Sequence, residues 1–74
     1  MIRYANLGGN SGVWGYEVGD SFIKVRFNDG CTYLYDGMRP GRSQVEEMKR
    51  LANAGIGLNS YISRYIKKNY ARKG

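Results

Sequence analysis

The chain contains no histidine, one cysteine and one proline among its 74 residues. The lack of histidine removes the commonest general base and the commonest nitrogen ligand for metals. The single cysteine, Cys31, excludes an intrachain disulfide and any zinc site built on several thiolates. Because small secreted domains usually carry disulfides, we expect a reducing, cytoplasmic location. We therefore expect a non-enzymatic protein with no catalytic residues, no metal site and no cofactor.

Acidic residues and long apolar runs are also scarce. No apolar run is long enough to cross a bilayer, so we predict no membrane span and no membrane partner. The chain has 6 acidic residues against 12 Lys and Arg residues, a net charge of +6. Such an excess favours an anionic partner, either nucleic acid or a nucleotide. The length allows one domain with a small core, which a homo-oligomer or a partner would help to stabilise.

The basic excess lies in the second half of the chain. Residues 1–38 hold 3 cations and 4 anions, whereas residues 39–74 hold 9 cations and 2 anions. A solvated surface accounts for many such charge runs, and an anion-binding face accounts for others. The concentration of charge in one half of so small a domain weakens the first explanation, and both explanations stay open.

Alternating apolar and polar residues predict three strands, at Val13–Val18, Ser21–Asn28 and Cys31–Asp36. Asp29-Gly30 is a strong hairpin signal between the last two strands. The Gly-rich stretch near the start predicts a flexible leader over residues 1–12, with an anion-binding nest as the alternative.

Two helices are predicted after the strands. Ser43 and Glu46 fit a capping box before a helix whose apolar face is Val45, Met48, Leu51 and Ala52. A second helix is expected at about 60–70, capped by Asn59 or Ser60. Its apolar stripe would consist of Leu58, Tyr61, Ile62, Tyr65, Ile66 and Tyr70. The predicted fold is α+β, a three-stranded antiparallel β-meander followed by two α-helices packed on one face, with residues 71–74 as a basic tail.

The segment from Gly15 to Ile62 resembles the KTSC domain, a short module at the C-terminus of some lysyl-tRNA synthetases and in free-standing small bacterial proteins. The matching residues are Gly15-Tyr16, the strand Ile23-x-Val25-x-Phe27, Gly30, Tyr33-Leu34-Tyr35, and the downstream Gly55, Leu58, Asn59 and Ile62. Departures are Met38-Arg39-Pro40 in place of Val-Pro-Pro, Asn53 in place of Ser, and Leu58 in place of an aromatic residue.

The resemblance implies a single KTSC-like domain over residues 13–70, built as a small β-meander followed by helices. It implies RNA binding as an expectation from the synthetase attachment. It brings no catalytic residues.

The role of Tyr33 and Tyr35 depends on the register of the predicted hairpin. A two-residue turn at Asp29-Gly30 would place both tyrosines on a sheet face with Lys24 and Arg26, as a stacking platform. A three-residue loop, with Gly30 in the left-handed conformation, would instead place Val25 opposite Tyr33, Ile23 opposite Tyr35 and Phe27 opposite Cys31. The tyrosines would then be core residues beneath the helices.

The candidate anion-binding residues are basic. They form a predicted stripe on the second helix and tail, with further cations on the strands and before the first helix: Arg64, Lys67, Lys68, Arg72, Lys73, Lys24, Arg26, Arg39 and Arg42. The candidate stacking residues are Tyr33, Tyr35 and Trp14, although Trp14 also fits a core or interface anchor.

The sequence favours a binding module for nucleic acid, with RNA preferred. One alternative is a homo-oligomer that sequesters a phosphate-bearing nucleotide or signalling metabolite, as small phage-encoded proteins do. Another is an adaptor whose basic surface meets an acidic protein.

Overall fold

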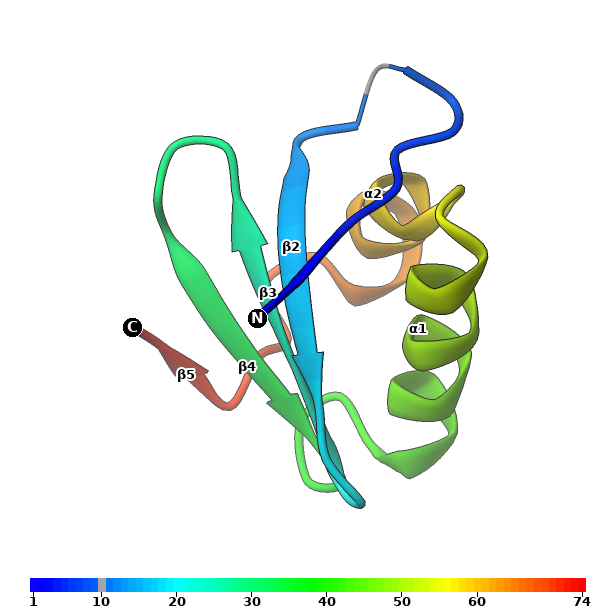
Figure 1. Cartoon of the computed structure of the whole chain (residues 1–74). Helices are drawn as coiled ribbons and strands as arrows, with labels where there is room; N and C mark the ends of the chain where they lie inside the picture. Colours follow the sequence, from blue (N-terminus) through cyan, green and yellow to red (C-terminus); the bar gives the residue numbers. More distant parts are fainter. Residues whose placement is uncertain (10) are drawn as a thin grey trace.

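The computed structural model describes residues 1–9 and 11–74. Over these residues, one antiparallel sheet contains five strands that lie side by side in chain order. The strands are β1 (Ile2–Arg3), β2 (Val13–Val18), β3 (Phe22–Phe27), β4 (Thr32–Asp36) and β5 (Arg72–Lys73). Helix α1 (Arg42–Ala54), helix α2 (Leu58–Tyr61) and the π-helical turn η1 (Ile62–Ile66) lie on one side of this sheet (Figure 1). The predicted α+β class is confirmed, and the sheet has two strands more than predicted.

The core lies between the sheet and the helices. Along β3, Ile23 and Val25 are 0% exposed, and the intervening Lys24 points to the opposite face because side chains alternate along a strand. The buried hydrophobic side chains of the described residues form one cluster. Its members are Tyr4, Val13, Tyr16, Ile23, Val25, Tyr35, Val45, Met48, Ala52, Leu58, Ile62 and Ile66.

The hairpin between β3 and β4 has the three-residue loop. Cα partners are Val25 with Tyr33 and Ile23 with Tyr35. Phe27 N–H donates to the Cys31 carbonyl at 2.9 Å, which closes the loop. Gly30 adopts φ 92°, a left-handed conformation that suits glycine at the bulge position. The prediction of core-facing tyrosines is confirmed, and the two-residue turn is wrong.

The first residues of the chain pair with the sheet and reach the core, so the prediction of a flexible leader over residues 1–12 is wrong for residues 2–4. Ile2–Arg3 pairs with β2. Tyr4 is 4% exposed, and its hydroxyl accepts a 3.3 Å hydrogen bond from the Leu58 N–H. Pairing with β2 and the burial of Tyr4 therefore attach this segment to the rest of the domain. Asn10, inside the predicted Gly-rich stretch, lies outside the described residues.

Helix α1 begins without the predicted capping box. Gly41 occupies the cap position with φ 114° and provides no side-chain hydrogen bond. Ser43 therefore lies inside the first turn, where its hydroxyl does not act as the cap. Glu46 forms an ion pair with Lys49 at 3.0 Å instead of reaching back to the helix start.

The second helical segment is shorter than predicted. It begins at Leu58, after Gly57 at φ 90°, so Asn59 and Ser60 lie within α2 and do not cap it. It ends at Ile66, because Lys67 has φ 55° and the chain turns away. The predicted apolar stripe is therefore incomplete: Tyr65 is 65% exposed, and Tyr70 lies beyond the helix.

The predicted basic tail forms a short edge strand. In β5, Arg72 pairs with Leu34 and Lys73 pairs with Tyr33. The Ala71 N–H donates to the Leu34 carbonyl at 2.7 Å, which brings the segment alongside β4. Because the two residues alternate in direction, Lys73 lies on the face of Tyr33 and Arg72 on the face of Leu34.

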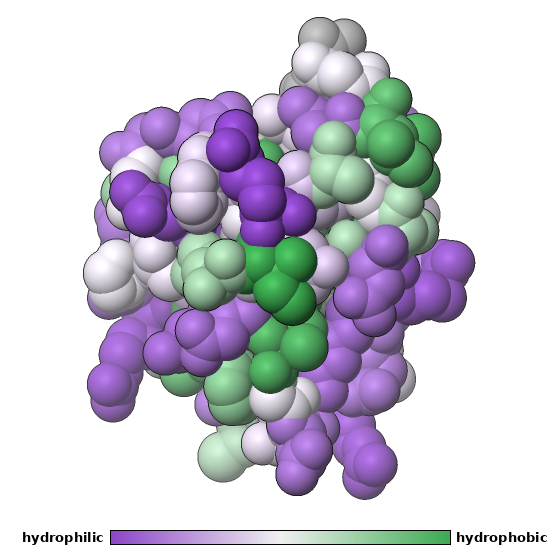
Figure 2. All heavy atoms as spheres, in the orientation of Figure 1, coloured by the Kyte–Doolittle hydropathy of each residue, from purple (hydrophilic) through white to green (hydrophobic). Residues whose placement is uncertain are grey.

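Hydrophilic residues cover most of the face in Figure 2, which has the orientation of Figure 1, and clusters of apolar residues interrupt them. The exposed large hydrophobic side chains include Leu7 at 70% and Ile56 at 51%. None of the helices formed by residues 1–9 and 11–74 combines the length and the hydropathy needed to cross a membrane.

The loop after α1 depends on a glycine at position 55. Gly55 has φ 76°, and a Cβ built there would lie 2.6 Å from the Cβ of Ala5. We expect Gly55→Ala to lower the free energy of unfolding by about 1–3 kcal/mol, since both the backbone and the contact oppose it. Gly37→Ala is the control, because a Cβ at Gly37 meets no atom within 4 Å. Equal urea midpoints for the two variants would contradict the close approach of the N-terminal segment to this loop.

Candidate functional site

A groove of about 610 Å³ opens between the β3–β4 hairpin and the segment that follows η1. The hairpin contributes Phe27, Tyr33 and Tyr35 to it. The later segment contributes its cations together with Tyr70. The groove forms because the helical segment ends at Ile66 and the chain crosses back to pair with β4.

Aromatic rings make a continuous wall in this groove. The ring centroids of Tyr33 and Tyr70 lie 4.8 Å apart, with the planes tilted by 58°. Phe27 meets Tyr33 edge to face at 5.5 Å, and Tyr35 meets Tyr70 in a T-shaped pair at 6.5 Å. These distances are typical of favourable aromatic contacts, so the rings hold one another in place. Tyr33 and Tyr70 are both only partly buried, which leaves part of their surfaces accessible to a ligand.

Three lysines line the same groove: Lys67, Lys68 and Lys73, all of them exposed. The ammonium nitrogen of Lys73 lies 5.7 Å from the centroid of the Tyr33 ring, within the range of a cation–π contact. The neighbouring Tyr33 hydroxyl raises the pKa of Lys73, so this lysine is charged throughout the neutral range. The groove therefore combines stacking surfaces with positive charge.

One acidic side chain, Asp29, also lines the groove. Its carboxylate accepts a 2.9 Å hydrogen bond from the Cys31 N–H in the hairpin loop. This bond is typical of Asp in turns and fixes the loop that carries Gly30. Asp29 is therefore explained by the hairpin, and it reduces the positive charge of the groove by one.

Tyr35 lies at the floor of the groove and is 1% exposed. Burial, with smaller contributions from Tyr33 and Tyr70, raises the pKa of Tyr35 to about 12. The phenol is neutral at physiological pH. Tyr35 is thus a core residue that packs behind the aromatic wall. Tyr33 is partly buried: it packs against the core and also lines the groove.

The predicted basic stripe along one helix and its tail does not form. Lys67, Lys68 and Lys73 come together in the groove, but Arg64 on η1 does not line it. Arg39 donates a 3.2 Å hydrogen bond to Asn69, and Arg42 lines a small hollow at the start of α1. These arginines are cations outside the groove.

The remaining predicted residues lie on the sheet face opposite the helices. Lys24 and Arg26 alternate with the buried residues of β3, and Arg72 lies in register with Leu34. The indole of Trp14 lies against Arg26, whose guanidinium carbon is 5.0 Å from the ring centroid. Trp14 is therefore neither a core residue nor part of the groove.

Sequence reasoning misses Tyr70 as a residue of the groove and Arg3 as a residue of the sheet. Helical periodicity places Tyr70 on a helix, and the Lys67-Lys68-Asn69 stretch before it is the signal that the helix stops. The glycines place Arg3 in a leader, although the alternation of Ile2, Arg3 and Tyr4 fits a short strand. Both residues are misplaced for the same reason: the two ends of the chain pair with strands that are distant in the sequence, and local patterns do not predict such pairing.

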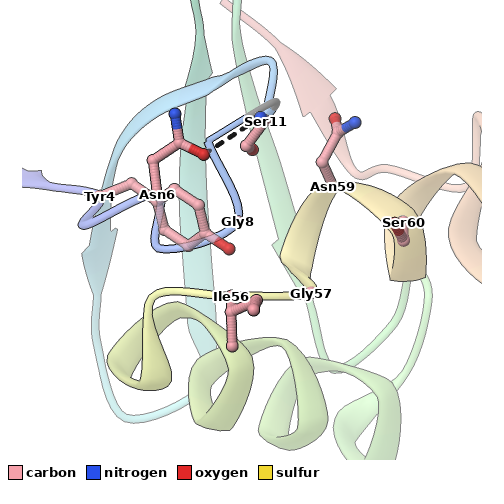
Figure 3. Close-up of a pocket in the computed structure, with 8 residues that line it drawn as sticks. All are labelled: Tyr4, Asn6, Gly8, Ser11, Ile56, Gly57, Asn59 and Ser60. Atoms are coloured by element: carbon pink, nitrogen blue, oxygen red, sulfur yellow. Dashed lines mark hydrogen bonds between the residues drawn. The ribbon is translucent and has the colours of Figure 1, made fainter.

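A second, smaller pocket of about 240 Å³ lies between the N-terminal segment and α2. Figure 3 shows Tyr4 and Asn6 on one side of it, and Asn59 and Ser60 on the other. Asn6 uses its side-chain oxygen to accept a 3.0 Å hydrogen bond from the Ser11 N–H. Its lining is uncharged over the described residues, so it offers no cationic side chain to a phosphate.

No group of three or more His, Cys, Asp or Glu side chains comes together to hold a metal ion within residues 1–9 and 11–74. Comparisons with protein-family models, with curated proteins and with solved structures gave no match for this chain.

The raised pKa of Tyr35 gives a testable signature. Unfolded tyrosine ionises near its ordinary pKa of 10.0, and folded Tyr35 only near 12, so the folded state holds an extra proton between these values. The free energy of unfolding therefore falls as the pH rises through this window. Tyrosinate absorbance should show a late component that Tyr35→Phe removes. A titration complete by pH 11 in the folded protein would contradict the placement of Tyr35.

Proposed function

We propose that this protein is a small binding module for single-stranded nucleic acid. The groove is the binding site: Lys67, Lys68 and Lys73 contact phosphates, and bases stack on Tyr33 and Tyr70. The observation that carries the proposal is the meeting of three lysines with an aromatic wall in one open groove. Single-stranded nucleic-acid sites combine these two features in the same way.

The energetics favour unpaired strands over duplexes. Stacking of one base on an aromatic side chain contributes about 1–3 kcal/mol, and it requires a base that is free of its own stack. Phosphate contacts add a term that depends on salt, because each contact releases counterions. RNA is the favoured form of the partner, since the KTSC resemblance implies RNA.

The groove size also supports the nucleotide alternative. Sites for small molecules commonly have volumes of about 300–1,000 Å³, and the groove lies in this range. In that case a homo-oligomer sequesters a phosphate-bearing nucleotide or signalling metabolite. A large rise in melting temperature with adenosine monophosphate, together with an oligomeric native mass, would favour this function over strand binding.

We propose a role without catalysis, in a cytoplasmic setting. The chain has no histidine, and its cysteine is free. A catalytic site needs an activated nucleophile or a positioned acid–base pair. The groove offers phenols, ammonium groups and one carboxylate that is engaged in the hairpin loop.

We also propose that the resemblance to the KTSC domain reflects a shared fold. Three glycines of the resembling pattern have structural reasons to be glycine. A Cβ at Gly15 would lie 2.7 Å from the Ile2 carbonyl oxygen, and Gly30 and Gly55 have positive φ. The central tyrosines build the core and the groove wall. These roles support a common scaffold and leave the ligand as the property to be measured.

Salt-dependent binding tests the proposed function. We expect a labelled oligouridylate of about 12 nucleotides to bind at low salt, as measured by fluorescence anisotropy. The double variant Lys68→Gln/Lys73→Gln should bind more weakly. Its log–log slope of affinity against salt should fall in magnitude by about 1.4, because two phosphate contacts are lost.

Two further variants sharpen this test. Tyr33→Ala should weaken binding by about 1–3 kcal/mol without changing the salt slope, provided that circular dichroism shows a folded protein. Arg50→Gln is the matched control for the lysine variants. Arg50 is paired with Glu47 on the outer face of α1, away from the groove. If the lysine variants retain the affinity and slope of the unaltered protein, the groove is not the binding site.

A further inference from the structure

The sheet face opposite the helices carries a second cluster of cationic and aromatic side chains. No helix of the described residues lies on this face, as Figure 1 shows. Trp14, Lys24 and Arg26 of the inner strands lie on it, and the edge strands add Arg3 and Arg72. We call this surface the open face.

Two arginines from different strands hold the indole of Trp14. The guanidinium carbon of Arg3 lies 4.8 Å from the ring centroid, and that of Arg26 lies 5.0 Å from it. A bulge between Val13 and Gly15 turns Trp14 toward this face. The result is a planar, partly exposed group flanked by positive charge, of the kind on which bases stack.

The cations beside this group lie in a cross-strand row. Strand register places Glu17, Lys24, Leu34 and Arg72 next to one another across β2, β3, β4 and β5. Neighbouring strands are about 4.8 Å apart, so this row spans the sheet. Among the described residues, the strands therefore place four cations on the open face against two anions, Glu17 and Asp36. The Asp36 carboxylate accepts hydrogen bonds from the N–H groups of Met38 and Arg39 in the turn after β4.

Packing explains part of this cluster and leaves part unexplained. Cation–π contacts with Trp14 account for Arg3 and Arg26 as structural residues. They do not account for Lys24 and Arg72. Within the described residues, the ion pairs are those of Lys49 with Glu46 and Arg50 with Glu47, so neither of these two cations is in an ion pair. Both are available to an anion.

Strand β5 joins the open face to the groove. Its two residues point in opposite directions, with Lys73 beside Tyr33 in the groove and Arg72 beside Leu34 on the open face. As the edge strand of the sheet, β5 is where a bound chain could pass from one face to the other. One cation therefore lies on each side of this edge.

We propose that the open face is a second contact surface for the same single strand of nucleic acid. The strand leaves the groove over β5, its phosphates contact Arg72 and Lys24, and a base stacks on the Trp14 cluster. The choice of nucleic acid as partner rests on the proposed function of the groove. The surface itself is independent of the groove, because the two share no side chain.

Trp14 is the single tryptophan of the chain, so its fluorescence reports on the open face alone. We expect oligouridylate of about 12 nucleotides to quench this fluorescence as it binds. The double variant Lys24→Gln/Arg72→Gln leaves both arginines on the indole in place. It should shift the quenching midpoint to about tenfold higher RNA concentration and reduce the salt slope by about 1.4. Arg50→Gln should leave both quantities unchanged.

The groove variant Lys68→Gln/Lys73→Gln separates the two proposals. It should weaken binding but retain quenching of Trp14 at saturation. Suppose that anisotropy shows RNA binding, that Trp14 fluorescence does not change, and that Lys24→Gln/Arg72→Gln binds with full affinity. This result would overturn the proposal for the open face and would leave the proposal for the groove intact. Loss of affinity only in the open-face variant would overturn the groove instead. Absence of RNA binding at low salt would overturn both.

A parallel titration with phosphatidylserine vesicles tests whether the open face binds an anionic lipid surface instead of nucleic acid. The proposal expects no quenching of Trp14 by vesicles at salt concentrations that permit quenching by RNA. Quenching by vesicles and not by RNA would overturn the assignment of a nucleic acid to the open face.

Discussion

The three-residue loop between β3 and β4 fixes the positions on which the rest of the molecule depends. Gly30 in its left-handed conformation, and the hydrogen bond between Phe27 and Cys31, set the register of the hairpin. A shift of one residue would move Tyr33 and Tyr35 to the opposite face. With the observed register, Tyr35 fills the core under the helices and Tyr33 reaches the groove.

The same alternation divides the positive charge between two surfaces. Lysines after η1 and on β5 meet the aromatic wall of the groove, while Lys24, Arg26 and Arg72 lie on the open face. The residues behind the net charge of +6 therefore do not form a single basic patch on the surface. The helical segment ends at Ile66, so the last residues return along β4 and the alternation along β5 separates Arg72 from Lys73.

The central strands follow from period-two patterns, and with the helical periodicity after them they predict the α+β class. The loop register does not follow from these patterns, because Gly30 fits both a two-residue turn and a three-residue loop, and the strand pairing of the structure decides between them. The sequence could not show that Ile2–Arg3 and Arg72–Lys73 pair with distant strands, since two-residue strands carry almost no local signal. The sequence patterns identify Tyr33, Lys67, Lys68 and Lys73 as candidate site residues. They place Lys67 and Lys68 on a helix, however, and the helical segment ends before them, at Ile66. The same predicted helix places Tyr70 in its apolar stripe, whereas Tyr70 lies beyond η1 and lines the groove.

Mapping of a bound strand by nuclear magnetic resonance tests the central claim most directly. With ¹⁵N-labelled protein and oligouridylate, the account predicts the largest shift changes at the amides of Tyr33, Lys68, Tyr70 and Lys73 around the groove. Amides on the outer face of α1, such as that of Arg50, should stay in place. Changes confined to α1, or none at all at low salt, would contradict the account.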